Sequence, residues 1–215
     1  MAKKMTLPTP PLSPEEFRAA TGASIPVMER LSAYADLLIK WQRRINLVGK
    51  ATLDDLWRRH MLDSAQLHPL IPVSARTLVD LGSGAGFPAL VLAILGVPGV
   101  HLVESDGRKC AFLQEAARAT GTTVEIHRTR IEKTSPISAD VVTARACAPL
   151  VSLVEYARPF LKKGSICLFS KGRNAQEELT ESQKKWIMQV TRIRSLTDSQ
   201  AEILKLEEIG RRNES

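Results

Sequence analysis

The chain has 215 residues, which fits one domain, or a compact domain with a smaller appendage, and excludes a large multidomain assembly. Its 44% hydrophobic and 25% charged residues are close to the average of globular proteins, which excludes wholesale disorder. The formal net charge of +7 favours a polyanionic partner such as nucleic acid without identifying one.

The sequence has no pattern typical of a membrane or secreted protein. The longest uninterrupted apolar run, residues 89–95, is far shorter than the roughly 20 residues that cross a bilayer. The first residues carry two lysines without a following apolar stretch, so a secretory signal is not expected. We therefore expect a cytoplasmic protein that makes no membrane contact.

The first part of the chain is predicted to be a flexible lead-in followed by helices. Prolines at positions 8, 10, 11 and 14 make residues 1–12 a poor helix or strand. Ser13, Pro14 and Glu16 then form the pattern of a capping box, which predicts a short helix that Gly22 ends.

A second, longer helix follows, and the spacing of its apolar residues indicates one buried face. These residues recur at steps of three and four: Val27, Leu31, Tyr34, Leu38, Trp41 and Ile45. Thr52 is predicted to cap a further helix that carries Trp57 and His60. Residues 13–72 are therefore predicted to form a helical N-terminal extension.

From residue 73 onward, predicted strands alternate with predicted helices. The strands are expected at 77–81, 100–104, 123–127, 140–144 and 165–170, with helices at 87–95, 109–120 and 150–161. This alternation predicts an α/β fold with a Rossmann-like, doubly wound sheet over residues 73–215. Residues 190–196 and 201–209 are expected to add an antiparallel hairpin at one edge.

The most informative segment is a glycine-rich turn between the first of these strands and its helix. It contains Asp80, Gly82, Gly84, Gly86 and Phe87. Glycines allow a ligand to approach the backbone, and the following helix offers free N–H groups to an anion. A dinucleotide-binding turn would need glycine where Phe87 stands, so the pattern disfavours an NAD-dependent oxidoreductase.

A second acidic residue completes a pattern typical of a nucleoside pocket. Glu104 ends the next predicted strand, eighteen residues after Gly86, where its carboxylate can accept hydrogen bonds from both ribose hydroxyls. The turn and Glu104 together resemble the class I S-adenosylmethionine-dependent methyltransferases. In such a pocket the turn's amides suit the cofactor's carboxylate, and Asp80 suits its ammonium group.

Several further segments resemble one methyltransferase family, the bacterial RsmG family, also called glucose-inhibited division protein B. They are residues 45–48 (INLV), 59–64 (RHMLDS), 82–88 (GSGAGFP), 130–132 (RIE), 145–146 (RA) and 171–172 (KG). The resemblance spans residues 30–172. It implies a methyltransferase that uses S-adenosylmethionine to modify N7 of a guanine in the decoding-region (530) loop of 16S ribosomal RNA, as free RNA or in the small ribosomal subunit.

The same resemblance implies roles for particular residues. Gly82 and Phe87 would line the cofactor pocket, Ile131 and Glu132 would flank the adenine, and Arg145 would stand where the methyl group is transferred. Arg145 is therefore the predicted catalytic residue and also a predicted cofactor contact. The other predicted cofactor-binding residues are those of the turn and the strand end: Asp80, Gly84, Gly86 and Glu104.

Methylation at N7 is consistent with the absence of the motif that amino methyltransferases use. N7 has a lone pair and no proton, so its methylation needs no general base. The Asn/Asp-Pro-Pro-aromatic motif typical of amino methyltransferases is missing after the fourth predicted strand. Cys110, Cys147 and Cys167 are widely spaced and are expected to be buried thiols, with neither a disulfide nor a metal site predicted.

Two other functions stay open at this point. A small-molecule methyltransferase of the same architecture would have a lidded apolar pocket and no salt dependence of substrate binding. A non-catalytic RNA-binding protein would bind S-adenosylmethionine without transferring its methyl group. The sequence does not indicate an oligomer.

Overall fold

The computed structural model describes residues 10–212, so most of the predicted lead-in over residues 1–12 lies outside the described residues. The last part of that segment is fixed to the helical region. The Leu12 amide donates to Oδ1 of Asp55 over 2.8 Å, and the Pro10 carbonyl accepts from Arg58 over 2.6 Å. Arg58 also pairs with Asp55 at 2.8 Å, so one carboxylate holds both the arriving chain and the next helix.

The first helix, α1 (Pro14–Thr21), begins and ends where the sequence predicts. The Ser13 side chain accepts from the Glu16 amide, and the Glu16 side chain accepts from the Ser13 amide, so the capping box is complete. Gly22 ends the helix at φ 69°, a left-handed conformation that glycine adopts without the strain other residues incur.

The long helix α2 (Ile25–Gln42) buries its predicted face. Leu31, Tyr34 and Leu38 are fully buried, and Trp41 packs at the edge of the same core. Ile45 lies beyond the helix end because the helix stops at Gln42, whose side chain holds the turn that follows. Its Oε1 accepts from the amides of Leu47 and Val48.

The next predicted helix is present, but its form and its start differ from the expectation. A 3-10 turn, η1 (Lys50–Thr52), leads to a π-helical segment, η2 (Trp57–Leu62), and then to α3 (Asp63–Ala65) and η3 (His68–Leu70). Thr52 is not a helix cap. Its hydroxyl donates to the Gly49 carbonyl and also contacts Nε2 of His60 at 2.7 Å, so it is used in a tertiary contact.

Residues 78–211 form one mixed sheet of seven strands in the order β3-β2-β1-β4-β5-β7-β6. The five parallel strands are β1 (Leu78–Leu81), β2 (Val100–Glu104), β3 (Glu125–Arg128), β4 (Ala139–Arg145) and β5 (Leu161–Lys171). The predicted edge hairpin is confirmed as β6 (Trp186–Arg194) and β7 (Glu202–Arg211), with β7 antiparallel to β5.

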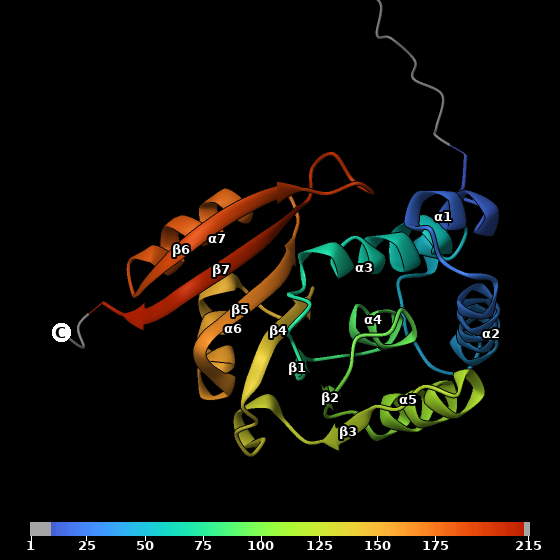
Figure 1. Ribbon diagram of the computed structural model, residues 1–215, viewed down its shortest axis with the longest axis horizontal. Helices are drawn as coiled ribbons and strands as arrows, with labels where there is room; N and C mark the ends of the chain where they lie inside the picture. The colour runs from blue at the N-terminus through green and yellow to red at the C-terminus, as the bar shows by residue number, and fades with distance from the viewer. Residues whose placement is uncertain (1–9, 213–215) are drawn as a thin grey trace, which may run out of the picture.

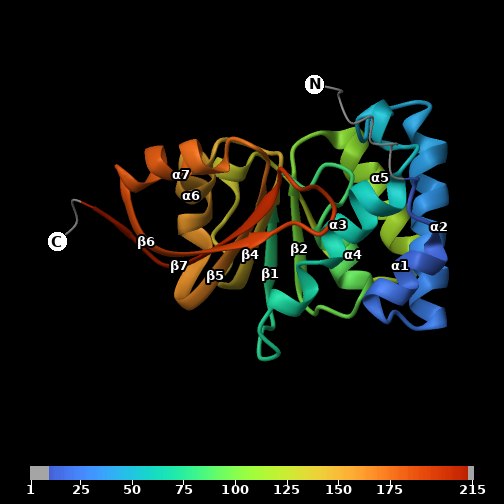
Figure 2. The same ribbon diagram turned by 90° about the horizontal axis from the view of Figure 1, so that it is seen from above.

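Helices cover the two faces of the sheet unequally (Figure 1). On one face lie α4 (Ala89–Ile94) and α5 (Gly107–Thr120), with α2 packed outside them (Figure 2). The other face carries α6 (Leu150–Ala157), η5 (Arg158–Phe160) and α7 (Ala175–Gln183). The sequence analysis did not predict α7, whose surface is mostly polar.

The N-terminal helices and the sheet share one hydrophobic core. Phe17 of α1 and Leu31 of α2 belong to the same buried cluster as Leu102 of β2 and Phe112 of α5. A second cluster lies under α6 and α7 on the opposite face. Because β1, β2 and β4 are parallel neighbours, their carboxyl ends meet at one edge of the sheet, beside the N-terminal helices. Among residues 10–212 no helix is long and apolar enough to cross a membrane.

Candidate functional site

A cleft of about 850 Å³ lies at this edge of the sheet, a size usual for sites that bind small molecules and cofactors. Five segments form most of its border: 47–63 in the N-terminal extension, 82–87 in the glycine-rich turn, 145–149 after β4, 170–172 at the end of β5, and 197–201 between β6 and β7. Lys109 and Glu178 complete the border. Four of the predicted site residues line the cleft: Gly82, Gly84, Phe87 and Arg145.

Asp80 lies beneath the turn, in the interior of the protein. It is 1% exposed, and its Oδ1 accepts from the Thr143 hydroxyl of β4 over 2.6 Å. Burial raises the pKa of Asp80 to about 7, although hydrogen bonds from Thr143 and Ser83 oppose the shift. Its Oδ2 atom is buried and has no hydrogen-bond partner among the described residues. An acceptor left in this state is suited to a ligand donor or to an ordered water.

The turn has the backbone that its glycines predict. Gly82, Gly84 and Gly86 have φ values of 66°, 57° and 94°, all in the region that favours glycine. A Cβ at Gly82 would collide with the sulfur of Cys147, and one at Gly86 would lie 3.0 Å from Leu90 and the Tyr34 hydroxyl.

Three amides of the turn already have partners within the protein. The Ser83 amide donates to the Val103 carbonyl, the Gly86 amide to the Ser83 carbonyl, and the Gly84 amide to Oε2 of Glu104 over 2.8 Å. A cofactor carboxylate at the turn would have to use the remaining N–H groups or replace Glu104 at Gly84. Fewer amides are therefore free for the cofactor's carboxylate than the glycine-rich pattern suggested.

Glu104 ends β2, as predicted, and its carboxylate is held in place by the backbone. Oε2 accepts from Gly84, and Oε1 accepts from the Asp106 amide over 2.7 Å. A carboxylate oxygen has two lone pairs, so each oxygen retains an acceptor position for a hydroxyl group. Glu104 itself is 8% exposed and does not line the cleft, but Gly84, to which it is bonded, does.

Phe87 forms part of an aromatic stack instead of projecting freely into the cleft. Its ring stacks on His60 with a centroid separation of 4.9 Å, and Tyr34 packs against it at 5.3 Å. The Tyr34 hydroxyl donates to the Ala85 carbonyl, which ties α2 to the turn. The helical extension therefore supports the turn directly.

Arg145 lies at the end of β4 and is held by four groups from the rest of the protein. Its guanidinium lies 4.9 Å from the centre of the Phe87 ring. Nη1 donates to the Arg59 carbonyl and to Asp63, and Nη2 contacts Nδ1 of His60 at 2.9 Å. The planar guanidinium can satisfy these acceptors at once because its N–H groups point in fixed directions.

His60 is neutral, and its contacts define its tautomer. Burial, with help from Arg145 and Arg59, lowers the pKa of His60 to about 3. Because Arg145 donates to Nδ1, the ring proton must be on Nε2, from which it is donated to Thr52. His60 and Asp63 both lie in the network that holds Arg145.

The segment between β6 and β7 closes over the same network. The Thr197 hydroxyl donates to Oδ1 of Asp63 over 2.7 Å, and Asp198 pairs with Arg59 at 3.6 Å. The Leu196 amide donates to the side chain of Gln66. Residues 130 or more positions apart in the sequence thus meet beside the cleft, and no local sequence signal predicted the role of Thr197.

The prediction that all three cysteines are buried is wrong for Cys147, which is exposed and lines the cleft. Cys110 and Cys167 are buried as predicted. The residue before it, Ala146, has φ 48°, an uncommon conformation for a non-glycine residue. Partial burial and the nearby carboxylate of Asp80 raise the pKa of the Cys147 thiol, so the environment does not activate it as a nucleophile.

The remaining predicted residues lie beside the cleft. Ile131 and Glu132 belong to the short turn η4 (Ile131–Lys133), and Ile131 would be 4.0 Å from a Cβ at Gly82. The Glu132 side chain is exposed and bonds to Tyr156. Lys171, in one of the segments that resemble the family, lines the cleft but is buried, and its ammonium group donates to Glu178 and to the Ala148 carbonyl.

The residues present fit S-adenosylmethionine. Asp80 offers a buried oxygen without a partner to an ammonium group, and Glu104 retains acceptor positions for hydroxyl groups. Gly82 leaves no room for a side chain where the cleft meets the turn. A small nucleoside with a positively charged amino-acid end matches this set of groups.

The strand order, together with the acidic glycine-rich turn after β1, defines a class I S-adenosylmethionine-dependent methyltransferase fold. Solved structures support the class. The ribosomal protein L11 methylase of Lactobacillus delbrueckii subsp. bulgaricus has a TM-score of 0.57 at 17% identity, covering 69% of this chain and 76% of that one. A SAM dependent methyltransferase from Aquifex aeolicus has a TM-score of 0.56 at 14% identity, covering 73% and 95%.

The chain matches the GidB family, described as rRNA small subunit methyltransferase G, over residues 27–206, and it belongs to that family. Two relatives carry the name ribosomal RNA small subunit methyltransferase G. The one from Paramagnetospirillum magneticum is 59% identical over 93% of this chain and 98% of its own length. The one from Rhodospirillum rubrum is 57% identical over 93% and 100%. The predicted fold class and the family resemblance are confirmed.

Proposed function

We propose that this protein transfers a methyl group from S-adenosylmethionine to N7 of a guanine in the decoding-region (530) loop of 16S ribosomal RNA. The family makes it a methyltransferase of small-subunit ribosomal RNA that depends on S-adenosylmethionine. Beyond the family assignment, we propose that the target guanine lies in the 530 loop and that the protein acts in the cytoplasm. The observation that carries it is the cleft, which the glycine-rich turn and Arg145 both line. The turn and Arg145 lie within residues 27–206, which match the family.

The site suits a nucleophile that carries no proton. Bound S-adenosylmethionine supplies an electrophilic methyl group on a positively charged sulfur. His60 is neutral, but both ring nitrogens are occupied by Arg145 and Thr52, and the pKa of Cys147 is raised. Neither is arranged as a general base. N7 of guanine needs none, so catalysis rests on alignment, which can supply about 7–11 kcal/mol.

Different residues of the site would align the cofactor and the target base. Asp80, Gly82, Gly84 and Gly86 would hold the amino-acid end of the cofactor, and Glu104 its ribose. Phe87 supports the turn, and Ile131 and Glu132 would lie toward the adenine. Arg145, fixed by Asp63 and His60, would contact the target guanine or its phosphate at the open side of the cleft.

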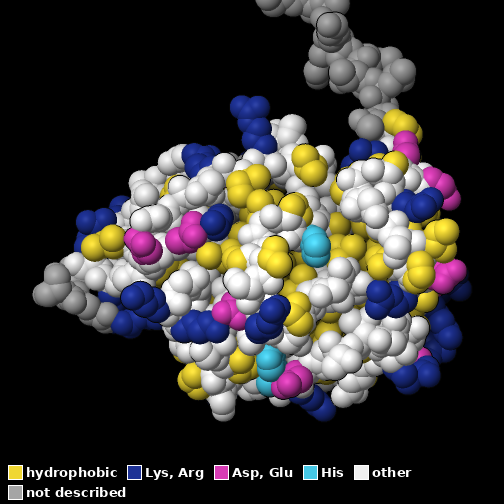
Figure 3. All heavy atoms as spheres, viewed as in Figure 1, with side chains coloured by type: hydrophobic (Ala, Val, Ile, Leu, Met, Phe, Trp, Pro, Cys, Tyr) yellow, Lys and Arg dark blue, Asp and Glu magenta, His cyan; other side chains and the backbone are white. Residues whose placement is uncertain are grey.

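Substrate RNA would meet a dispersed set of cations. Lys and Arg side chains stand at several separate places around one face of the molecule, with hydrophobic side chains between them (Figure 3). N7 is inaccessible in the deep, narrow major groove of A-form RNA, so the target base must be splayed out or lie in an irregular loop. Residues 13–72 would form the extension that receives that loop, since part of this extension, between residues 47 and 63, borders the cleft.

Labelled methyl transfer tests the function. We expect S-adenosylmethionine with a radioactive methyl group to label small-subunit RNA from a strain without this enzyme, at one aniline-sensitive N7-methylguanine. Naked 16S RNA and intact small subunits, assayed in parallel, would identify the substrate form. Label in another nucleoside, or none with either substrate, would overturn the proposal. RNA from the parent strain, which retains the enzyme and is already methylated, is the matched control and should accept little label.

A conservative change at Asp80 tests the ammonium contact and its pH dependence. Because the Asp80 pKa is raised to about 7, protonation competes with a bound cation, so cofactor affinity should weaken as the pH falls below about 7. Asp80→Asn should bind S-adenosylmethionine at least about tenfold more weakly at pH 8 and lose this pH dependence. Calorimetric titrations from pH 6 to pH 8 measure both effects.

Asp80→Asn should stabilise the fold although it weakens cofactor binding, and unfolding followed from pH 4 to pH 7 measures this effect. A carboxyl group whose pKa is higher in the folded protein than in the unfolded chain destabilises the fold as the pH rises between the two values, by about 1.4 kcal/mol per pKa unit. Relative to the wild type, Asp80→Asn should therefore gain stability between pH 4 and pH 7. An Asp80→Asn protein that binds the cofactor normally at pH 8 would show that this carboxylate does not contact it.

A further inference from the structure

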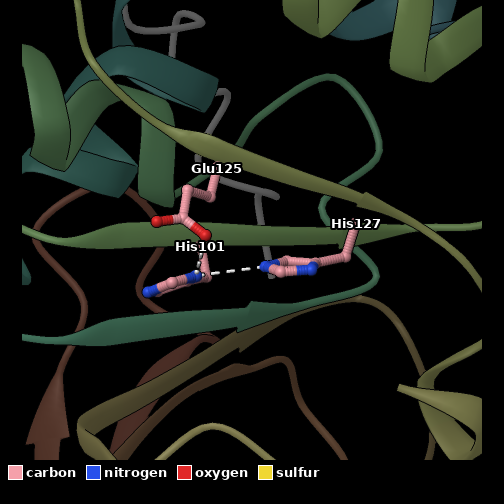
Figure 4. Close-up of side chains that lie close together, drawn as sticks. All are labelled: His101, Glu125 and His127. Carbon is pink, nitrogen blue, oxygen red and sulfur yellow. Dashed lines mark hydrogen bonds and ion pairs between the residues drawn. The ribbon is translucent and has the colours of Figure 1, made fainter. Parts of the chain in front are cut away.

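Three potential metal ligands come together on the sheet, away from the cleft (Figure 4). His101 of β2 lies opposite Glu125 of β3 in the strand register, and His127 follows two positions along β3. In parallel strands, residues in register and residues two apart project from the same face. The three side chains therefore share one face and converge, and none of them lines the cleft.

This face of the sheet lacks a covering helix at the edge formed by β2 and β3. Leu102 belongs to the core under α5, so His101, its neighbour in the strand, points to the other face. There the connection from β3 to β4, described in full, contains only the short turn η4, and α6 and α7 cover later strands. None of the four β3 residues is buried, so ions in solution can reach the cluster.

The distances between the ligand atoms match a metal site. Nδ1 of His101 lies 3.1 Å from Nε2 of His127 and 3.3 Å from Oε2 of Glu125. Tetrahedral zinc with bonds of about 2.0–2.1 Å places neighbouring ligand atoms roughly 3.3–3.4 Å apart. The third pair, Glu125 with His127, is within 4.8 Å, and the Glu125 side chain is 70% exposed and free to rotate closer.

We propose that His101, Glu125 and His127 bind one divalent transition-metal ion of the zinc type, with a water in the remaining position. Two imidazoles and one carboxylate are a donor set that zinc accepts, and imidazole ligands disfavour magnesium and calcium. The ion would join the edge strand β3 to β2 and so stabilise an edge that no helix covers on this face. No sequence pattern indicates this site, because a whole helix and its loops separate His101 from Glu125 and His127.

Zinc titration of the untagged full-length protein, stripped with a chelator, tests the proposal. Calorimetry should give one ion per chain, and His127→Gln should weaken binding at least tenfold, with a smaller loss for Glu125→Gln. Substitution with Co²⁺ should give visible absorption bands of a four-coordinate site in the wild type and not in His127→Gln. Zinc should also raise the thermal midpoint of the wild type more than that of the variant.

The matched control is His68→Gln, since His68 is an exposed histidine outside the cluster and its loss should leave the titration unchanged. His127 and Glu125 lie at the surface of an edge strand, and circular dichroism verifies that their variants fold. Absence of saturable zinc binding would overturn the proposal. So would stoichiometric binding that is equal in the wild type, His127→Gln and Glu125→Gln, since the ion would then occupy other ligands such as the thiols.

Discussion

Gly82→Ala is expected to reduce S-adenosylmethionine binding roughly 100-fold and methyl transfer with it. The new Cβ would lie less than 3.0 Å from the Cys147 sulfur, and the residue would need φ 66°, a conformation that costs non-glycine residues about 1–2 kcal/mol. A displaced turn misaligns the cofactor, and an error of about 1 Å is enough for a 100-fold loss. Equilibrium binding and labelled methyl transfer measure the two effects.

Gly121→Ala is the control that introduces the backbone strain of Gly82→Ala without its collision with Cys147. Gly121 has φ 60° at the end of α5, with no atom within 4 Å of its Cβ position, so its substitution introduces strain alone. It should lower the thermal midpoint and leave cofactor affinity within about twofold. Combining Gly82→Ala with Cys147→Gly should restore part of the binding. Wild-type affinity in Gly82→Ala would show that the turn does not hold the cofactor.

Arg145→Ala is expected to lower turnover roughly 100-fold while cofactor affinity changes much less. The guanidinium is held over Phe87 by Asp63 and His60, which fixes it at the open side of the cleft where RNA would enter. A preorganised cation of this kind acts on the reacting base or its phosphate without reorganisation cost. Single-turnover methyl transfer, with cofactor binding measured separately, tests the expectation.

Two controls accompany this variant. Arg145→Lys keeps the charge but loses the planar set of donors, so its turnover should fall between the alanine variant and the wild type. Arg118→Ala removes an exposed arginine that pairs only with Glu115 among the described residues, and its activity should match the wild type. Because Arg145→Ala removes the donor to Oδ2 of Asp63 and to Nδ1 of His60, its thermal midpoint should fall as well. Full activity in Arg145→Ala would refute its assignment to the reaction.

The network around Arg145 explains why the helical extension and the edge hairpin belong to the site. Asp63 accepts from Arg145 with one oxygen and from Thr197 with the other, so the end of β4, the extension and the hairpin loop meet at one carboxylate. Tyr34 joins α2 to the glycine-rich turn. Helix packing therefore positions groups at the cleft in addition to covering the sheet.

The sequence by itself determined the elements whose causes are local. The capping box at Ser13, the left-handed glycines of the turn and the alternation of strands and helices depend on neighbours in the chain, and the structure has them where they were predicted. Acidic residues at the ends of β1 and β2 follow from the same alternation, because parallel strands bring their carboxyl ends to one edge.

Only the tertiary structure decided how those residues are used. Glu104 is held by two backbone amides, Lys171 is buried in an ion pair, and Cys147 faces the cleft, none of which spacing along the chain could indicate. Thr52 appeared to be a cap but bonds to His60. These roles depend on partners far away in sequence, and burial then sets the charge state of Asp80 and His60, so they exist only once the chain has folded.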